Sequence, residues 1–228
     1  MLSSIIYSGA SPQAIFLEVC ALIIAVIIAI VMHELAHGWV ALKQGDYTAK
    51  AQGRLTLNPV KHFDLLGFLM MLFAGFGWAK PVPINPSYFK KLRKGLFLVS
   101  IAGVVTNIIL AVIFFLLLAF VLPLIPYGTI FYTFFFNLFL YGVSLNLSLA
   151  AFNLLPVYPL DGFRIIESFS KPYNKFCVFM RKYGYYVFLG LVALSYLSSW
   201  FGLPFLDIIG MYTGFIKGVI LKLLLLLV

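Results

Sequence analysis

The segment VMHELAHGWV, residues 31–40, places two histidines four positions apart, with a glutamate directly after the first. On a helix, residues four apart share one face, so His33 and His37 can bind one tetrahedral metal ion. Glu34 can then reach a water molecule at the open metal position and act as a general base. The pattern predicts a zinc-dependent hydrolase, although a pattern this short also occurs by chance in soluble chains.

The same segment lies in a candidate membrane span. Residues 19–42 carry one formal charge, Glu34, and no Lys or Arg lies within eight residues of it. A glutamate inside a span costs a few kcal/mol on insertion scales, so it needs a function or a partner. Two of the three histidines of the chain are also in this segment. We therefore expect a metal site; the alternative is a structural polar cluster or a proton relay.

The composition predicts an all-α polytopic membrane protein with about five to six transmembrane helices. Of the 228 residues, 63% are hydrophobic and 10% charged, and residues 95–160 and 183–206 contain no Asp, Glu, Lys or Arg. A span takes roughly 20 apolar residues, and a soluble domain of this length exposes more polar surface. The net charge of +9 is typical of loops beside a membrane, so no nucleic-acid partner is expected.

The positive charges predict the orientation. Residues 1–17 contain no Lys or Arg and residues 43–61 contain four, so the N-terminus is expected outside and the first helix runs inward. The next basic cluster, residues 90–94, follows the apolar segment 65–79. At about 1.5 Å per residue this segment reaches about 22 Å, short of a ~30 Å core, so we expect a re-entrant or embedded loop.

The rest of the chain alternates between the two sides of the membrane. Further helices are expected at about 96–122, 130–155, 184–200 and 205–228. This path places Asp207 outside, sends the last helix back inward and leaves Lys217 deep within it. The two cysteines, Cys20 and Cys177, are expected to be free because they lie on opposite sides.

A catalytic zinc ion takes a third protein ligand, and Asp161 has the right depth to be that ligand. It follows Pro156 and Pro159, which end the inward helix, and precedes Arg164, the first charge of the inner loop. Irregular backbone at this depth is tolerated only where protein buries it or where it lines a wet cavity. The alternative is that Asp161 merely caps a short helix over residues 162–169. The remaining candidates are Glu18, Asp46, His62, Asp64, Glu167 and Asp207.

Together these segments resemble the site-2 protease family of intramembrane zinc metalloproteases. The resemblance rests on HELAHGW, on NLLPVYPLDG (residues 153–162), and on LTLNP followed by FGWAKPVPINP, and it covers residues 20 to about 165 most closely. It implies one Zn²⁺ per chain, with Asp161 as the third ligand. Gly103 and Asn107 match the Gly-x-x-x-Asn motif of the family's middle core helix. Phe163 stands where many members have a second glycine, which leaves the ligand in place but puts the neighbouring backbone in question.

The resemblance also sets the expected function. The chain has no PDZ-like or CBS-like insert, so residues 1–228 are expected to form a single transmembrane protease domain, with a catalytic core at about 15–165 and accessory helices at about 183–228. We expect a multi-pass enzyme of the cell membrane that cleaves transmembrane-segment protein substrates in or near the bilayer, with its site opening toward the cytoplasm. The alternative is an ion or proton transporter with a His/Glu relay, although ionisable groups do not string across the bilayer.

Two features are candidates for substrate contact. Asn107 and Asn153 could bind the substrate backbone, and interhelical hydrogen bonding is an equally good reading of both. Residues 49–58 and 78–86 are compatible with a small membrane-associated β-sheet, which could pair with an unwound substrate as an added strand.

Overall fold

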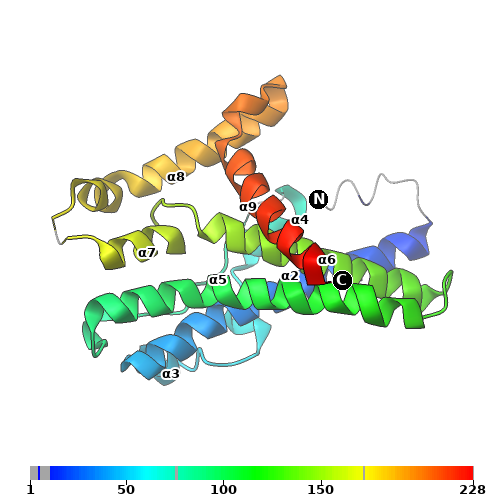
Figure 1. The fold of residues 1–228 in the computed structure, drawn as a ribbon, viewed down its shortest axis with the longest axis horizontal. Helices are drawn as coiled ribbons and strands as arrows, with labels where there is room; N and C mark the ends of the chain where they lie inside the picture. Colours follow the sequence, from blue (N-terminus) through cyan, green and yellow to red (C-terminus); the bar gives the residue numbers. More distant parts are fainter. Residues whose placement is uncertain (1–4, 6–10, 75–76, 172, 228) are drawn as a thin grey trace.

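The computed structural model describes residues 5, 11–74, 77–171 and 173–227. Three long helices lie side by side along the long axis of the molecule: α2 (Pro12–Gln44), α5 (Leu92–Leu116) and α6 (Ile130–Asn153) (Figure 1). Fully buried alanines, Ala21 and Ala111 among them, contribute to the cluster that joins the helices. Such small residues let helix axes approach closely within a membrane. We call α2, α5 and α6 the core bundle.

The number of spanning helices is lower than the sequence suggested. In the described part of the chain, four helices are long and apolar enough to cross a membrane: the three of the core bundle and α8 (Lys175–Phe201). The helix over the last apolar run, α9 (Ile208–Leu224), has 17 residues and spans about 26 Å, less than a ~30 Å core. The expected all-α polytopic fold is confirmed, with four such helices rather than five to six.

The helix α8 begins earlier than the expected start at residue 184. The side chain of Asn174 accepts hydrogen bonds from the backbone N–H groups of Phe176 and Cys177, which caps the helix at this point. Arg181 and Lys182, expected in a loop, therefore lie on α8 itself. The charges mark the polar end of a helix here, and the cap decides where it starts.

The last helix runs in the direction opposite to the expected one. The hydroxyl of Tyr212 donates to the carbonyl of Leu154, and the amine of Lys217 lies 3.4 Å from the hydroxyl of Ser148. Leu224, at the far end of α9, joins the buried cluster near the start of α6. Thus α9 is antiparallel to α6, whereas alternation predicted that both run inward. Figure 1 shows α8 leaning away from the core bundle and α9 returning from the far end of α8 to the bundle.

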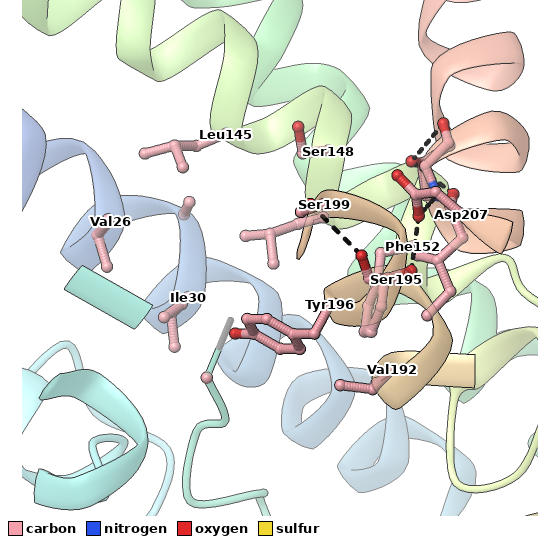
Figure 2. Close-up of a pocket in the computed structure, with 16 residues that line it drawn as sticks. Val26, Ile30, Leu145, Ser148, Phe152, Val192, Ser195, Tyr196, Ser199 and Asp207 are labelled. Carbon is pink, nitrogen blue, oxygen red and sulfur yellow. Dashed lines mark hydrogen bonds between the residues drawn. The ribbon is translucent and has the colours of Figure 1, made fainter. Parts of the chain in front are cut away.

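The hairpin of α8 and α9 leaves an apolar cavity of about 400 Å³ against the core bundle. Figure 2 shows Val26 and Ile30 of α2 on one wall and Ser195 and Tyr196 of α8 on another. The carboxylate of Asp207 accepts hydrogen bonds from the Ser195 hydroxyl at 2.6 Å and from a backbone N–H of α9 at 2.8 Å. These bonds tie α8 to the start of α9.

The apolar segment after the first inner loop turns back on itself, as expected. The helix α4 (Leu65–Ala74) covers its first part, and the isolated antiparallel bridge between Phe63 and Ala79 brings its two ends together. A side-chain carbon on Gly67 would lie 2.1 Å from the carbonyl oxygen of Trp78, so only glycine allows this close return. The two ends of the segment therefore lie side by side, as a re-entrant path requires.

The prediction of a small β-sheet beside the site is wrong. The described residues contain no β-strand; the first half of the expected sheet instead holds the short helix α3 (Thr48–Ala51). The second half is extended but is held by side chains, because Pro81 and Pro83 lack the N–H groups that a ladder needs. Arg54 donates to the carbonyls of Lys80 and Pro81 at 2.7 and 3.1 Å. We call residues 79–85 the extended segment.

The helix α7 (Asp161–Phe169) follows α6 after a short irregular stretch. Phe163 is 1% exposed and packs with Cys177 and Met180 of α8. The residue that departs from the family pattern thus fills a gap between α7 and α8. Both cysteines are free, as expected. The remaining turns are η1 (Pro59–Lys61), η2 (Pro86–Tyr88), η3 (Leu117–Val121), η4 (Leu122–Leu124), η5 (Pro204–Leu206) and η6 (Leu225–Leu227).

Candidate metal centre

Three side chains from two distant parts of the sequence converge at one end of the core bundle. His33 and His37 lie one turn apart on α2, and Asp161 is the first residue of α7. The Nε2 atoms of the two histidines are 3.0 Å apart. Oδ2 of Asp161 lies 3.5 Å from Nε2 of His33 and 3.2 Å from Nε2 of His37. In the described part of the chain, this is the one group of three or more His, Cys, Asp or Glu side chains that lie close enough together to hold a metal ion.

These separations fit a zinc ion. Bonds of about 2.0–2.1 Å in tetrahedral geometry set the donor atoms about 3.3 Å apart. The three measured separations lie on either side of that value. Asp161 is also not the cap of α7, because the cap position is Leu160. The alternative that Asp161 merely caps the short helix is therefore wrong.

Hydrogen bonds on the far side of each imidazole fix which nitrogen carries the proton. Nδ1 of His37 lies 2.7 Å from the carbonyl oxygen of Val99, and a carbonyl can only accept. Nδ1 of His33 lies 2.5 Å from Oδ1 of Asn107, whose amide group donates elsewhere. Both Nδ1 atoms therefore donate, and in the neutral rings both Nε2 lone pairs point at the centre.

The centre thus collects hydrogen-bond acceptors without donors. Asp161 Oδ2 is buried and has no hydrogen-bond donor among the described residues. Three acceptors this close need a cation between them, a proton or a metal ion.

Gly103 on α5 provides the space for the two rings. A side-chain carbon at this position would lie 2.5 Å from His33 Cε1 and 2.5 Å from His37 Nε2. Asn107, one turn further along α5, contacts the other side of His33. The Gly-x-x-x-Asn spacing therefore places a gap and a hydrogen-bond acceptor on the same face of α5, against the metal ligands.

Glu34 lies beside the triad and is held by the extended segment. Its Oε2 accepts a hydrogen bond of 2.8 Å from the backbone N–H of Val82. Glu34, the three candidate ligands and Val82 line one cavity of about 150 Å³, which is large enough to hold water. The arrangement places a carboxylate where it can accept a proton from a water molecule at the centre.

The two asparagines expected at the substrate lie in different surroundings. Asn153 lines the cavity, and its amide donates to the carbonyl of Leu149 at 3.0 Å. Asn107 is fully buried between helices and bonded to His33, which favours the interhelical reading. Contact of either residue with a substrate stays a prediction.

The remaining ligand candidates serve other contacts. Asp46 accepts from the backbone N–H groups of Thr48 at 2.9 Å and Asn85 at 2.7 Å, so it anchors the end of the extended segment. Burial raises the pKa of the Asp46 carboxyl, but the hydrogen bond from the Thr48 hydroxyl, together with the two backbone bonds, outweighs burial and holds the pKa below its usual range. Glu18 accepts from the hydroxyl of Tyr141 on α6.

Sequence reasoning missed three groups around the centre, one side-chain amide and two backbone groups. Asn146 of α6 accepts a 2.8 Å hydrogen bond from the Asn107 amide, and it could have been noticed as a second amide in an uncharged span. The backbone groups of Val82 and Val99 leave no signal in the sequence, because every residue except proline carries both an N–H and a carbonyl.

Several known proteins are similar to this chain. The protein named "Putative zinc metalloprotease YwhC" from Bacillus subtilis (strain 168) is 50% identical over 175 residues, which covers 75% of this chain and 78% of that protein. A second relative, MJ0611 from Methanocaldococcus jannaschii, carries the same zinc metalloprotease designation and is 31% identical over 150 residues, 64% of this chain and 68% of that protein.

The family comparison agrees with these relatives. Residues 122–196 match the family model for peptidase family M50. A third relative with the same designation, Rip2 from Mycobacterium tuberculosis (strain ATCC 25618 / H37Rv), is 28% identical over 186 residues, 77% of this chain and 67% of that protein. No solved structure matches the chain significantly.

Proposed function

Because the chain belongs to peptidase family M50, the site-2 protease family, we propose that this zinc metalloprotease cleaves peptide bonds in or near transmembrane segments. It is a multi-pass membrane protein that acts on membrane substrates, since its helices are long and apolar and its family consists of membrane proteases. The observation that carries the proposal is the convergence of three acceptor atoms within 3.0–3.5 Å of one another.

In this proposal His33, His37 and Asp161 hold the zinc ion. The two Nδ1 hydrogen bonds orient both imidazoles toward it, and Gly103 leaves room for both rings. When bound, zinc supplies the Lewis acidity that makes water nucleophilic near neutral pH and polarises the scissile carbonyl.

Glu34 acts as the general base. Its carboxylate takes a proton from the attacking water and returns it to the nitrogen of the leaving amine. The 2.8 Å hydrogen bond from the Val82 N–H keeps it at the cavity wall, and it is not one of the three candidate ligands. If Glu34 instead belonged to a proton relay, its function would not depend on a bound metal ion.

The substrate lies along the extended segment in this scheme. A transmembrane helix hides its peptide bonds, so the substrate has to unwind before it reaches the cavity. The extended segment runs beside Glu34, and Asn153 lines the same cavity, where it can bind the unwound backbone. The side-chain anchors from Asp46 and Arg54 hold the segment in place without a neighbouring strand.

The site opens toward the cytoplasm, and the N-terminus lies outside. The centre lies at the end of the core bundle where α2 ends, α5 begins and α7 lies (Figure 1). Many basic residues lie on the elements at this end, as expected for a cytoplasmic face, among them Lys43, Lys50, Lys61, Lys90, Lys91, Arg93, Lys94 and Arg164. We place the catalytic core at residues 15–165 and regard α8 and α9 as accessory helices.

The proposal is tested by the zinc content of the purified protein, wild type beside Asp161→Ala. We expect about one zinc per chain in the wild type, a large loss in the variant, and cleavage of a transmembrane peptide only by the zinc-loaded wild type. A wild type that takes up no zinc when it is supplied would overturn the metal site. Activity that persists without zinc would overturn the metalloprotease mechanism.

A further inference from the structure

A line of hydrogen bonds crosses the core bundle and ends at a candidate zinc ligand. Asn146 of α6 donates to the carbonyl of Gly142 at 2.8 Å and accepts from the amide of Asn107 on α5 at 2.8 Å. Oδ1 of Asn107 then faces Nδ1 of His33 on α2 at 2.5 Å. Three helices are thus joined through two side-chain amides.

The direction of this line decides what His33 can do. An isolated Asn107 could turn either its oxygen or its amide nitrogen toward His33. With the nitrogen facing Nδ1, that ring atom would have to accept, and the proton of the neutral ring would sit on Nε2, where zinc binds. With the oxygen facing Nδ1, Nε2 is free for the metal.

Asn146, with the shorter of two hydrogen bonds, and the carbonyl of Ala29 together fix the orientation of Asn107. The nitrogen of Asn107 has two acceptors on the side away from His33, Oδ1 of Asn146 and the carbonyl of Ala29 at 3.3 Å. Asn146 cannot turn around either, because its own nitrogen is held by the carbonyl of Gly142, a group that only accepts. The line therefore starts at a fixed acceptor on α6.

Burial makes this line persistent. Asn107 and Asn146 are both 0% exposed, so water does not replace either partner. A buried amide left without a partner is costly, and a fully satisfied buried network is rigid. Gly142 also lets α5 and α6 come together, since a side-chain carbon there would lie 2.3 Å from the ring of Phe114.

We infer that Asn146 is a positioning residue of the zinc centre: through Asn107 it holds His33 in the tautomer and ring orientation that bind the metal. The inference rests on the proposed zinc site and extends it to α6, a helix that contributes none of the three candidate ligands. Asn107 contacts the ligand directly, and Asn146 acts one step further out.

The test measures zinc affinity by competition with a chromogenic chelator, on purified Asn146→Leu and Asn107→Leu. Asn107→Leu should lower the affinity about 10–100-fold, as for other groups that orient a metal ligand, and Asn146→Leu about tenfold. The matched control is Asn137→Leu, the same change nine residues earlier on α6 and about 13 Å away along the helix, which should bind zinc like wild type.

A second readout separates positioning from a general loss of structure. Cobalt-loaded protein should show a shifted visible spectrum in Asn146→Leu, because the His33 ring has moved, and an unshifted one in Asn137→Leu. In Asn146→Asp, a protonated aspartate can accept a hydrogen bond from Asn107 and donate one to Gly142. This variant should therefore have the zinc affinity and the cobalt spectrum of the wild type, unlike Asn146→Leu. If Asn146→Leu is not recovered folded, Asn146→Ala beside Asn137→Ala gives the same comparison.

The double variant Asn107→Leu/Asn146→Leu decides whether the two residues act in series. If Asn146 works through Asn107, the double variant should bind zinc as weakly as Asn107→Leu alone. Losses that multiply, or an Asn146→Leu that keeps wild-type affinity and spectrum while Asn107→Leu loses them, would overturn the inference. Wild type that binds no zinc would instead reject the site itself, a separate outcome.

Discussion

The core bundle and the α8–α9 hairpin are both built from apolar helices but hold their polar groups differently. In the most apolar stretches of α2 and α6, 39% of the residues are buried inside the protein, against 11% in α8. In the core bundle the amides of Asn107 and Asn146 and the His33 imidazole form a continuous hydrogen-bonded network, and the His37 imidazole donates to the carbonyl of Val99. The hairpin meets α6 through separate polar contacts, such as that of Lys217 with Ser148, and borders a 400 Å³ cavity.

This difference shows where side chains have to be positioned accurately. The ligand atoms have to stay within a few tenths of an ångström, and a network without free partners supplies that rigidity. The hairpin needs only to stay attached, so isolated contacts suffice. Substitutions should therefore be felt strongly in the core bundle and weakly in the hairpin, and each prediction below tests a part of that contrast.

The largest effect is expected at Glu34. Replacing Glu34 with Gln keeps the shape of the side chain but removes the proton acceptor, so peptide cleavage should fall about 10²–10⁴-fold. Because Glu34 is not one of the candidate ligands, the zinc content should stay at the wild-type level. Cleavage of a transmembrane peptide and elemental analysis on the same sample check both halves. An active Glu34→Gln enzyme would remove Glu34 from the mechanism.

The next effect compares one substitution in the two regions. Gly103→Ala puts a carbon 2.5 Å from the histidine rings, so it should displace them, cost about 1–3 kcal/mol of stability and lower the zinc affinity. Gly190→Ala on α8 has nothing within 4 Å and should change the stability by less than about 0.5 kcal/mol. Thermal melts with and without zinc measure both variants. A Gly103→Ala protein that keeps its zinc would show that the centre tolerates repacking.

A smaller effect is expected at Asp46, where pH is the variable. Its folded-state pKa lies below that of the unfolded chain, so its stabilisation is complete above the unfolded value of about 3.9 and is lost as pH falls through the folded value. Asp46→Asn should lower stability by about 1–3 kcal/mol at pH 7. The gap between wild type and variant should narrow below about pH 4 in unfolding experiments. A gap of constant size would assign the effect to packing.

The smallest effect is expected for the ion pair between α7 and α8. Arg181 donates to Glu167 at 2.6 Å, but the arginine side chain is 51% exposed, so solvent screens the pair. Arg181→Gln should change the melting temperature by an amount equivalent to at most about 1 kcal/mol, and less in high salt. Zinc binding should not change. A clear loss of zinc would show that α8 holds α7 and Asp161 in place after all.

Much of the centre could be predicted because its chemistry is carried by residue types. Two histidines at helical spacing in an apolar run, and an aspartate after two prolines, are rare enough to be informative without any structure. Their partners are less visible, because the N–H of Val82 and the carbonyl of Val99 belong to apolar residues. Only the fold brings these backbone groups to Glu34 and His37.

The errors in the fold have a common physical origin. Alternating charge and apolarity predicted the path of α8 and α9 as full crossings, but packing of Tyr212 and Lys217 against α6 sets the direction of α9. The expected sheet failed because Arg54 and Asp46 anchor the two ends of the extended segment and its prolines cannot donate to a ladder. In both cases contacts distant in sequence replaced the local rule.

The Pro-Val-Pro run beside Glu34 has a consequence for which chains can lie there. Between Pro81 and Pro83 the backbone offers one N–H, that of Val82, and Glu34 already holds it. The carbonyls of residues 82–84, in contrast, accept no hydrogen bond from the described part of the chain. This edge therefore has free hydrogen-bond acceptors but almost no free donor. A polypeptide that pairs with this edge would have to supply the N–H groups, so we expect a proline in its paired stretch to weaken binding whatever its side chains are.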